Sequence, residues 1–316
     1  MIKVILLLII GFILLVKASD VFVDAISSIA TNLHMSKMMI ALTVAAFGTC
    51  APELAISFNS ISSGSGDIAL ANVIGSNVVN ILLIVGLAAV ISPIKVKSSV
   101  TKKELPILLV ITSMFSISLT ANYILKEDFI LDRICGVLFF MFFVSFIAYI
   151  VSVVKAKQGI LEMSKAKYKP ITSIILAIVC CVVIVFASDL VVDNAKSLAT
   201  MLNVSEKIIT MTFVVIGTSL PEMTMTVIAA KKGEFDIALG NIIGTNIFNI
   251  GVVLGLPLMI YGGFTSNHFN LIDVLAVHIA AFALYYFARN DKVLSRKEGL
   301  IMILLFLIYY AYIFLQ

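Results

Sequence analysis

The stretch Phe47-Gly48-Thr49-Cys50-Ala51-Pro52-Glu53 places a glutamate in the middle of an apolar segment. The stretch Ile216-Gly217-Thr218-Ser219-Leu220-Pro221-Glu222 repeats this arrangement 169 residues later. Both segments are apolar enough to cross a membrane, and a charge at the centre of a bilayer costs about 2.5–3.5 kcal/mol even on insertion scales. No Lys or Arg lies at a comparable depth in any predicted span, so a buried ion pair does not explain the glutamates. The matched pair therefore indicates that the protein uses both carboxylates.

The composition around these stretches is that of a membrane protein. Of 316 residues, 61% are hydrophobic and 13% are charged, and the mean hydropathy is +1.14. A soluble domain carries about a quarter charged residues, and a helix needs ~20 apolar residues to cross a bilayer. The sequence predicts an all-α integral membrane protein with ten transmembrane helices, near residues 2–30, 37–61, 67–92, 105–123, 128–154, 171–200, 207–230, 236–261, 270–288 and 298–315.

The two halves of the chain repeat at this constant offset. The matched positions, 169 residues apart, include Gly48 and Gly217, Thr49 and Thr218, Pro52 and Pro221, Asn72 and Asn241, and Asn80 and Asn249. Five spans per half is an odd number, so the second half must enter the membrane from the opposite side. We expect two inverted-topology five-helix repeats, residues 1–154 and 171–316, joined by a linker at residues 155–170. Inverted repeats are typical of secondary transporters, whose substrate sites lie near the bilayer midplane between the repeats.

The lysines and arginines predict the orientation. The loops after the odd-numbered spans, the 155–170 linker among them, hold 16 of the 22 basic residues. Cytoplasmic loops carry the excess of Lys and Arg. We therefore expect a multi-pass protein of the plasma membrane, with both termini outside and the linker in the cytoplasm. Residues 1–16 are interpreted as the start of the first span, because no small-residue cleavage site follows them.

Each glutamate lies beside groups that suit a hard cation. Pro52 lacks an N–H and crowds the Gly48 carbonyl, as Pro221 does that of Gly217, and carbonyl oxygens freed in this way need another partner. A threonine four residues before each glutamate shares its helix face. Two further spans carry polar stripes at four-residue spacing, namely Asn72, Ser76 and Asn80, and Asn241, Thr245 and Asn249. We interpret Asn72 and Asn241 as contacts between helices, and the other four as cation ligands or their supports.

The doubled motif, each copy followed by Gly-(Ser/Thr)-Asn-x-x-Asn, resembles the two α-repeats of the sodium/calcium exchanger family within the cation/calcium antiporter superfamily. The short linker is similar to that of the prokaryotic members. The resemblance implies antiport of Na⁺ against Ca²⁺ by alternating access, with three Na⁺ per Ca²⁺. It also implies an ion-binding set of Ala46, Thr49, Cys50, Glu53, Ser76 and Asn80 in the first repeat, and of Val215, Thr218, Ser219, Glu222, Thr245 and Asn249 in the second.

Two positions depart from the family pattern. Cys50 stands where a hydroxyl is usual, and Asn249 stands where some microbial members have Asp. Ala46 and Val215 would bind through backbone carbonyls. The site would thus hold two carboxylates, whose charge balances one Ca²⁺, and both Ca²⁺ and Na⁺ are hard cations that oxygen ligands suit.

Other functions remain as alternatives. A proton/cation exchanger would use Glu53 and Glu222 as proton carriers, and a cation channel could be lined by two inverted halves. An intramembrane enzyme is disfavoured, because no nucleophile–base pair or cofactor motif is visible. We expect no enzyme activity and no cofactor, Ca²⁺ and Na⁺ as transported substrates, the lipid bilayer as surroundings, and neither nucleic acid nor an identifiable protein partner.

The remaining polar residues are interpreted as structural. Cys135, Cys180 and Cys181 read as small core residues, and His278 as a packed, hydrogen-bonded side chain. Four aspartates near helix ends are expected to form interfacial ion pairs close to Lys17 and Lys196, namely Asp20, Asp24, Asp189 and Asp193.

Overall fold

The computed structural model describes residues 2–64, 66–126, 129–156, 166–201, 216–266 and 269–315, and this part of the chain is almost entirely helical. The first half holds α1 (Ile2–Asn32), α2 (Lys37–Ile40), η1 (Ala41–Ala45), α3 (Ala46–Thr49), α4 (Ala51–Ser62), α5 (Gly66–Val78), η2 (Val79–Val85), α6 (Gly86–Ile91), η3 (Val100–Glu104), α7 (Leu105–Lys126) and α8 (Arg133–Ala156). The second holds α9 (Pro170–Met201), α11 (Leu220–Lys231), α12 (Phe235–Phe248), η4 (Asn249–Leu254), α13 (Gly255–Tyr261), α14 (Leu271–Asn290) and α15 (Arg296–Leu315). The η elements are π-helical turns that continue the α-helices beside them.

The predicted membrane spans have clear counterparts among these helices. Eight helices of the described chain are long and apolar enough to cross a membrane, and the bent pair Lys37–Thr49 and Pro52–Ser62 is a ninth candidate. The predicted span 207–230 lies partly outside the described residues, and its described part is mainly α11. The protein is thus an all-helical membrane protein.

The outer faces of the long helices are apolar. On α9, Ile171, Ile178, Val182 and Phe186 each expose more than 60% of their surface. Large aliphatic side chains exposed in such a row would be unfavourable in water and are what a lipid-facing surface requires. The two most buried spans are instead Gly66–Ile91 and Phe235–Tyr261, the spans that carry the polar stripes. The polar residues therefore lie inside the bundle.

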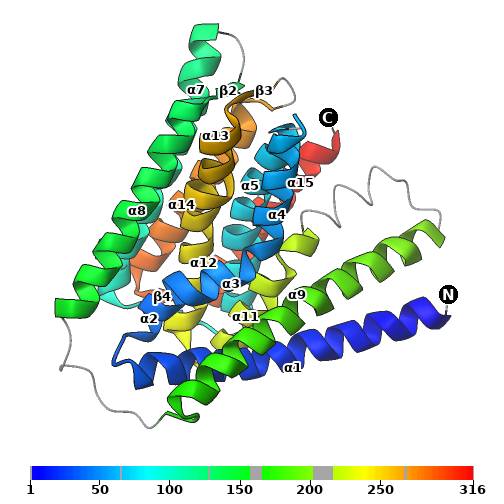
Figure 1. The fold of residues 1–316 in the computed structure, drawn as a ribbon, viewed down its shortest axis with the longest axis vertical. Helices are drawn as coiled ribbons and strands as arrows, with labels where there is room; N and C mark the ends of the chain where they lie inside the picture. Colours follow the sequence, from blue (N-terminus) through cyan, green and yellow to red (C-terminus); the bar gives the residue numbers. More distant parts are fainter. Residues whose placement is uncertain are drawn as a thin grey trace.

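Helices α1 and α9 form a pair that is set apart from the other helices. They run side by side over much of their length and are inclined to the upright helices of the bundle (Figure 1). The pair meets the bundle chiefly at α11, where the Ser19 hydroxyl donates to the Thr224 hydroxyl at 2.9 Å. This arrangement leaves one compact group of helices and one inclined pair beside it.

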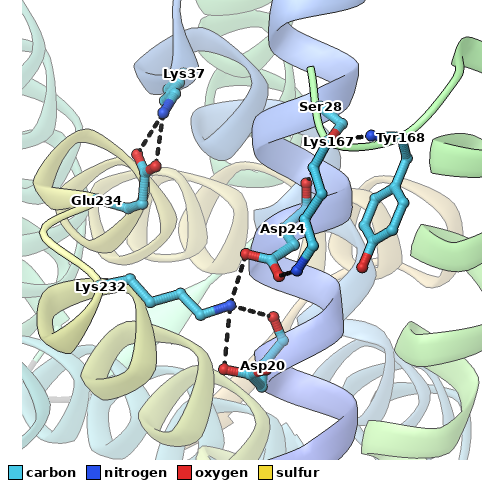
Figure 2. Close-up of polar contacts among 8 residues, drawn as sticks. All are labelled: Asp20, Asp24, Ser28, Lys37, Lys167, Tyr168, Lys232 and Glu234. Atoms are coloured by element: carbon cyan, nitrogen blue, oxygen red, sulfur yellow. Dashed lines mark hydrogen bonds and ion pairs between the residues drawn. The ribbon is translucent and has the colours of Figure 1, made fainter. Parts of the chain in front are cut away.

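A cluster of charged side chains joins α1 to the loops next to it (Figure 2). Lys232, just after α11, lies 2.6 Å from Asp24 and 3.1 Å from Asp20, and it also donates to the Asp20 carbonyl. Lys167 of the linker lies 2.5 Å from Asp24, and this contact raises the pKa of the lysine. The expected pairing of these two aspartates is thus present, but their partners are lysines from distant loops rather than Lys17. Lys37 and Glu234 form a further pair at 2.6 Å.

Two short antiparallel strand pairs fasten the loops at the ends of the bundle. Strand β1 (Ile94–Lys95) pairs with β4 (Val293–Leu294), and β2 (Phe129–Leu131) pairs with β3 (Phe264–Ser266). Each pair connects a loop of the first half to a loop of the second. The loops thus hold the two halves in a fixed relation around the buried spans.

Among the residues interpreted as structural, Cys135 and Cys180 are buried and Cys181 is half-buried. His278 lines a shallow apolar depression between α7 and α14. Its Nδ1 has no hydrogen-bond partner among the described residues, so the hydrogen bond expected for this atom is not present.

Candidate functional site

The helix is broken before Pro52, and the residue before α11 in the second half has nearly the same backbone conformation as the residue at this break. The chain bends by 54° between Lys37–Thr49 and Pro52–Ser62. Cys50 lies at this break with φ −79° and ψ 6°, and Ser219 lies before α11 with φ −88° and ψ 6°. Each break is followed at once by a proline in the first turn, where its missing N–H costs nothing. Glu53 and Glu222 consequently lie in the first turns of new helices, where the helix dipole favours a negative charge.

Both glutamates are enclosed in the protein. Glu53 is 1% exposed and Glu222 is fully buried. All four carboxyl oxygens lack a hydrogen-bond partner among the described residues, and neither glutamate forms an ion pair there. A buried charge without a partner is strongly unfavourable, so carboxylates placed in this way need a cation or a proton.

The carboxyl groups of Glu53 and Glu222, one from each half of the chain, lie close enough to interact. Glu53 lies within the electrostatic influence of Glu222 and of Thr218, and Glu222 lies beside Thr49. Cys50 has both glutamates and Thr245 as neighbours. Each carboxyl therefore interacts with the threonine of the other half, which brings these four predicted ligands together.

The spans that carry the polar stripes pack against the helices that carry the two glutamates. Ser76, Asn80, Thr245 and Asn249 are at most 1% exposed. One oxygen of each lacks a hydrogen-bond partner in the part of the chain that the structure describes: Ser76 Oγ, Asn80 Oδ1, Thr245 Oγ1 and Asn249 Oδ1. Carboxylate, amide and hydroxyl oxygens are the ligands that Ca²⁺ prefers. η4 packs against the Glu53 helix α4, and η2 packs against the Glu222 helix α11, so the polar stripes adjoin the glutamate helices of both halves.

Three π-helical turns adjoin these residues. η1 ends at Ala45, next to Ala46, η2 contains Asn80, and η4 begins at Asn249. Single π turns inside α-helices are common at functional sites. Nothing in the residue pattern indicates these turns, because the apolar pattern of the spans continues without a break.

Of the other predicted ligands, all but one lie in the described part of the chain. Ala46, Thr49, Cys50 and Ser219 are buried, and Thr218 is partly exposed. Val215 lies outside the described residues. A Cβ added to Gly244 would lie 2.6 Å from the Leu42 carbonyl oxygen and 2.9 Å from the Ala46 Cβ, so only glycine lets α12 approach η1 this closely.

Two backbone oxygens differ from expectation. The Gly48 carbonyl, expected to be free, accepts a hydrogen bond from the Cys181 thiol of α9 at 3.1 Å. The Ala46 carbonyl accepts from the Cys50 N–H at 3.1 Å and from the Thr49 hydroxyl at 3.4 Å. The Gly48 oxygen retains a second lone pair, whereas the Ala46 oxygen already accepts two hydrogen bonds in this conformation.

Asn72 and Asn241 form contacts between helices, as the sequence predicts. The Asn72 amide donates to the Glu53 carbonyl at 3.2 Å and to the Ser57 hydroxyl at 3.5 Å. The Asn241 amide donates to the Thr226 hydroxyl at 3.2 Å. The Ser57 and Thr226 contacts stand at equivalent positions of the two halves, and each ties a glutamate helix to the helix with the polar stripe.

Sequence reasoning missed Asn77 and Asn246. The Asn80 amide donates to Asn246 Oδ1 at 3.1 Å, and the Asn249 amide donates to Asn77 Oδ1 at 3.5 Å. The signal was present in the motif Gly-(Ser/Thr)-Asn-x-x-Asn, since the two asparagines are three residues apart and share a helix face.

Comparison with known proteins places this geometry in a family. A family model described as "Sodium/calcium exchanger protein" matches residues 3–152 and 172–315. The chain is 36% identical over 315 residues to the "Putative antiporter CaxA" of Alkalimonas amylolytica, covering 96% of this chain and 97% of the relative. It is 35% identical over 260 residues to the "Inner membrane protein YrbG" of Escherichia coli, with coverage of 81% and 80%. It is 30% identical over 346 residues to the "Sodium/calcium exchanger MaX1" of Methanosarcina acetivorans, with coverage of 98% of both chains.

A solved structure shares the whole fold. The sodium-calcium exchanger NCX_Mj, soaked with 10 mM Na⁺ and zero Ca²⁺, superposes with a TM-score of 0.82 at 30% identity and covers 98% of both chains. The likeness therefore extends over both halves of the chain. The resemblance seen in the doubled motif is confirmed: this chain belongs to the sodium/calcium exchanger family of prokaryotic type, a family of membrane transporters that carry out cation/calcium antiport.

Proposed function

We propose that this protein exchanges Na⁺ for Ca²⁺ across the plasma membrane, and that both ions bind at the shared place between Glu53 and Glu222. The observation that carries the proposal is the pair of buried carboxyls, one from each half, whose oxygens have no hydrogen-bond partner among the described residues. Their combined charge of −2 balances one Ca²⁺. The printed names of MaX1 and NCX_Mj as sodium/calcium exchangers support Na⁺ as the counter-ion.

The donor set supports competition between the two ions. Ca²⁺ takes six to eight oxygens, and two carboxylates, each able to bind through both oxygens, provide four of them. The amide and hydroxyl oxygens of Ser76, Asn80, Thr245 and Asn249 are buried without partners among the described residues, on spans that pack against the two glutamate helices. Na⁺ is also a hard cation and uses the same oxygens. The ligands are the twelve residues named from the motif, with Ala46 and Val215 acting through their carbonyls.

Antiport follows if the occupied site opens to one side at a time. We assign ten spans in two inverted halves, residues 1–154 and 171–316, with the 155–170 linker in the cytoplasm and both termini outside. The inclined pair α1 and α9 begins the two halves and borders the site through Cys181 and Ser19. These two helices are the elements that slide against the remaining helices, which keep the site intact.

An uptake experiment tests the proposal. Proteoliposomes loaded with Na⁺ are diluted into Na⁺-free medium that contains ⁴⁵Ca²⁺, and the account predicts saturable uptake that disappears without internal Na⁺. Uptake that follows a pH gradient and ignores Na⁺ would establish proton/cation exchange instead. Uptake that neither saturates nor needs a counter-ion would establish a channel.

A further inference from the structure

Asn77 and Asn246 contact the two asparagines assigned as ligands. Asn80 Nδ2 lies 3.1 Å from Asn246 Oδ1, and Asn249 Nδ2 lies 3.5 Å from Asn77 Oδ1. All four side chains are at most 1% exposed. Asn246 and Asn249 stand 169 residues after Asn77 and Asn80, so the two contacts are equivalent under the repeat. In each contact, an asparagine of one half accepts a hydrogen bond from an asparagine of the other half.

In the orientation that the structure gives these amides, the free ends in the described part of the protein are the oxygens of Asn80 and Asn249 and the nitrogens of Asn77 and Asn246. An asparagine side chain has two donor hydrogens at one end and an oxygen acceptor at the other. Because the nitrogens of Asn80 and Asn249 are engaged, their oxygens are left without a partner in the described part of the protein. The opposite orientation would turn the NH₂ groups toward the cation and repel it.

The geometry of the helices makes the arrangement reciprocal. Asn77 and Asn80 are three residues apart on the span that runs from α5 into η2, and Asn246 and Asn249 are three apart on the span from α12 into η4. Residues at this spacing share a helix face. The two spans touch along these segments. Each span therefore presents one acceptor and one ligand to the other.

We propose that Asn246 and Asn77 are positioning residues that hold Asn80 and Asn249 with their oxygens toward the bound ion. This inference rests on the function proposed above, because it concerns the same cation site. Residues that orient a metal ligand usually alter affinity by 10–100-fold when they are replaced. The effect of each positioning residue must pass through its own partner, Asn246 through Asn80 and Asn77 through Asn249.

A double-mutant cycle tests this on purified full-length protein, with Ca²⁺ as the probe and the Kd from calorimetry as the readout. Asn246→Ala should weaken Ca²⁺ binding by about tenfold, and it should have no further effect in an Asn80→Ala background, because the interaction is already lost. Asn77→Ala in the same Asn80→Ala background should still weaken binding, since its partner Asn249 is intact. Asn246→Asp keeps the acceptor oxygen and should restore binding to within a few-fold of the wild type.

Several outcomes would overturn the inference. One is that Asn246→Ala weakens Ca²⁺ binding by the same factor in the wild-type and the Asn80→Ala backgrounds. Another is that the Asn246→Asp variant binds Ca²⁺ as weakly as Asn246→Ala does. The mirror cycle, Asn77→Ala with Asn249→Ala, decides the question if Asn246→Ala does not fold. A wild type that binds no Ca²⁺ would refute the proposed function itself, whereas a binding wild type with additive variants would refute only the positioning role.

Discussion

The Cys181 thiol of α9 donates to the Gly48 carbonyl at the helix break, with Sγ and the oxygen 3.1 Å apart. A Cβ on Gly48 would lie 2.9 Å from this sulfur, so the contact depends on a glycine at the break. The oxygen that Pro52 frees from the helix ladder is thus satisfied by the inclined helix pair. If α9 slides during transport, this hydrogen bond must break and another partner, an ion or water, must replace it.

Replacing Cys181 with alanine should therefore lower the stability of the protein more than replacing its neighbour Cys180. Cys181→Ala leaves the half-buried Gly48 carbonyl without its donor, a loss of about 1 kcal/mol. Cys181→Ser keeps a donor and should be as stable as the wild type. Thermal unfolding in detergent, followed by circular dichroism, measures the difference. Cys180→Ala is the matched control, and equal midpoints for Cys181→Ala and Cys180→Ala would contradict the role of this hydrogen bond.

Cys50 is expected to weaken Na⁺ binding. Its thiol lies near both glutamates, and sulfur is a poor ligand for Na⁺ or Ca²⁺. Cys50→Ser supplies an oxygen at a position where Ser219 supplies one in the other half. We expect transport to be retained and the Na⁺ concentration for half-maximal exchange to fall by several-fold. Cys135→Ser should leave this concentration unchanged, and an equally unchanged Na⁺ requirement in Cys50→Ser would remove Cys50 from the ion-binding set.

Lys232 should stabilise the attachment of α1 to the bundle. Lys232→Gln removes its ion pairs with Asp20 and Asp24, while Asp24 keeps Lys167 (Figure 2). We expect a loss of about 1 kcal/mol in the free energy of unfolding, which should shrink in 1 M salt because screening weakens such pairs. Lys231→Gln is the control, since Lys231 forms no ion pair within the described ranges. The prediction fails if both variants unfold alike at low salt.

The orientation can be measured with reporter cysteines in a variant without the native cysteines. Lys102 and Ser63 are both exposed in the structure. Lys102 precedes the predicted span 105–123, and Ser63 follows the predicted span 37–61. With the basic loops in the cytoplasm, a cysteine at Lys102 should react with an impermeant reagent only from the cytoplasmic side, and one at Ser63 only from outside. The reverse labelling would invert the topology.

Features of the fold that depend on a single segment could be predicted from the sequence. Contacts between two distant segments could not. The apolar runs gave the helices, and the isolated glutamates with their prolines gave the breaks, because both signals are local. The partners of Asp24 and Gly48 were not predictable, since Lys167, Lys232 and Cys181 lie far away in the chain and nothing in their spacing points to them. The 169-residue repeat relates the asparagine pair of one half to that of the other. The contacts between the pairs were still not predicted, because a burial pattern specifies which side chains lie inside the protein and not which of them touch.

The most direct test of the central claim is the number of Ca²⁺ ions bound by the purified protein at equilibrium, measured with ⁴⁵Ca²⁺ for the wild type, Glu53→Gln and Glu222→Gln. The account has both carboxylates in one site, so it predicts one Ca²⁺ per wild-type chain. Removing one member of a buried charge arrangement costs about 3–5 kcal/mol, so each single variant should bind more than about 100-fold more weakly. Two ions bound by the wild type, with one retained at unchanged affinity in each variant, would show two separate sites and contradict the account.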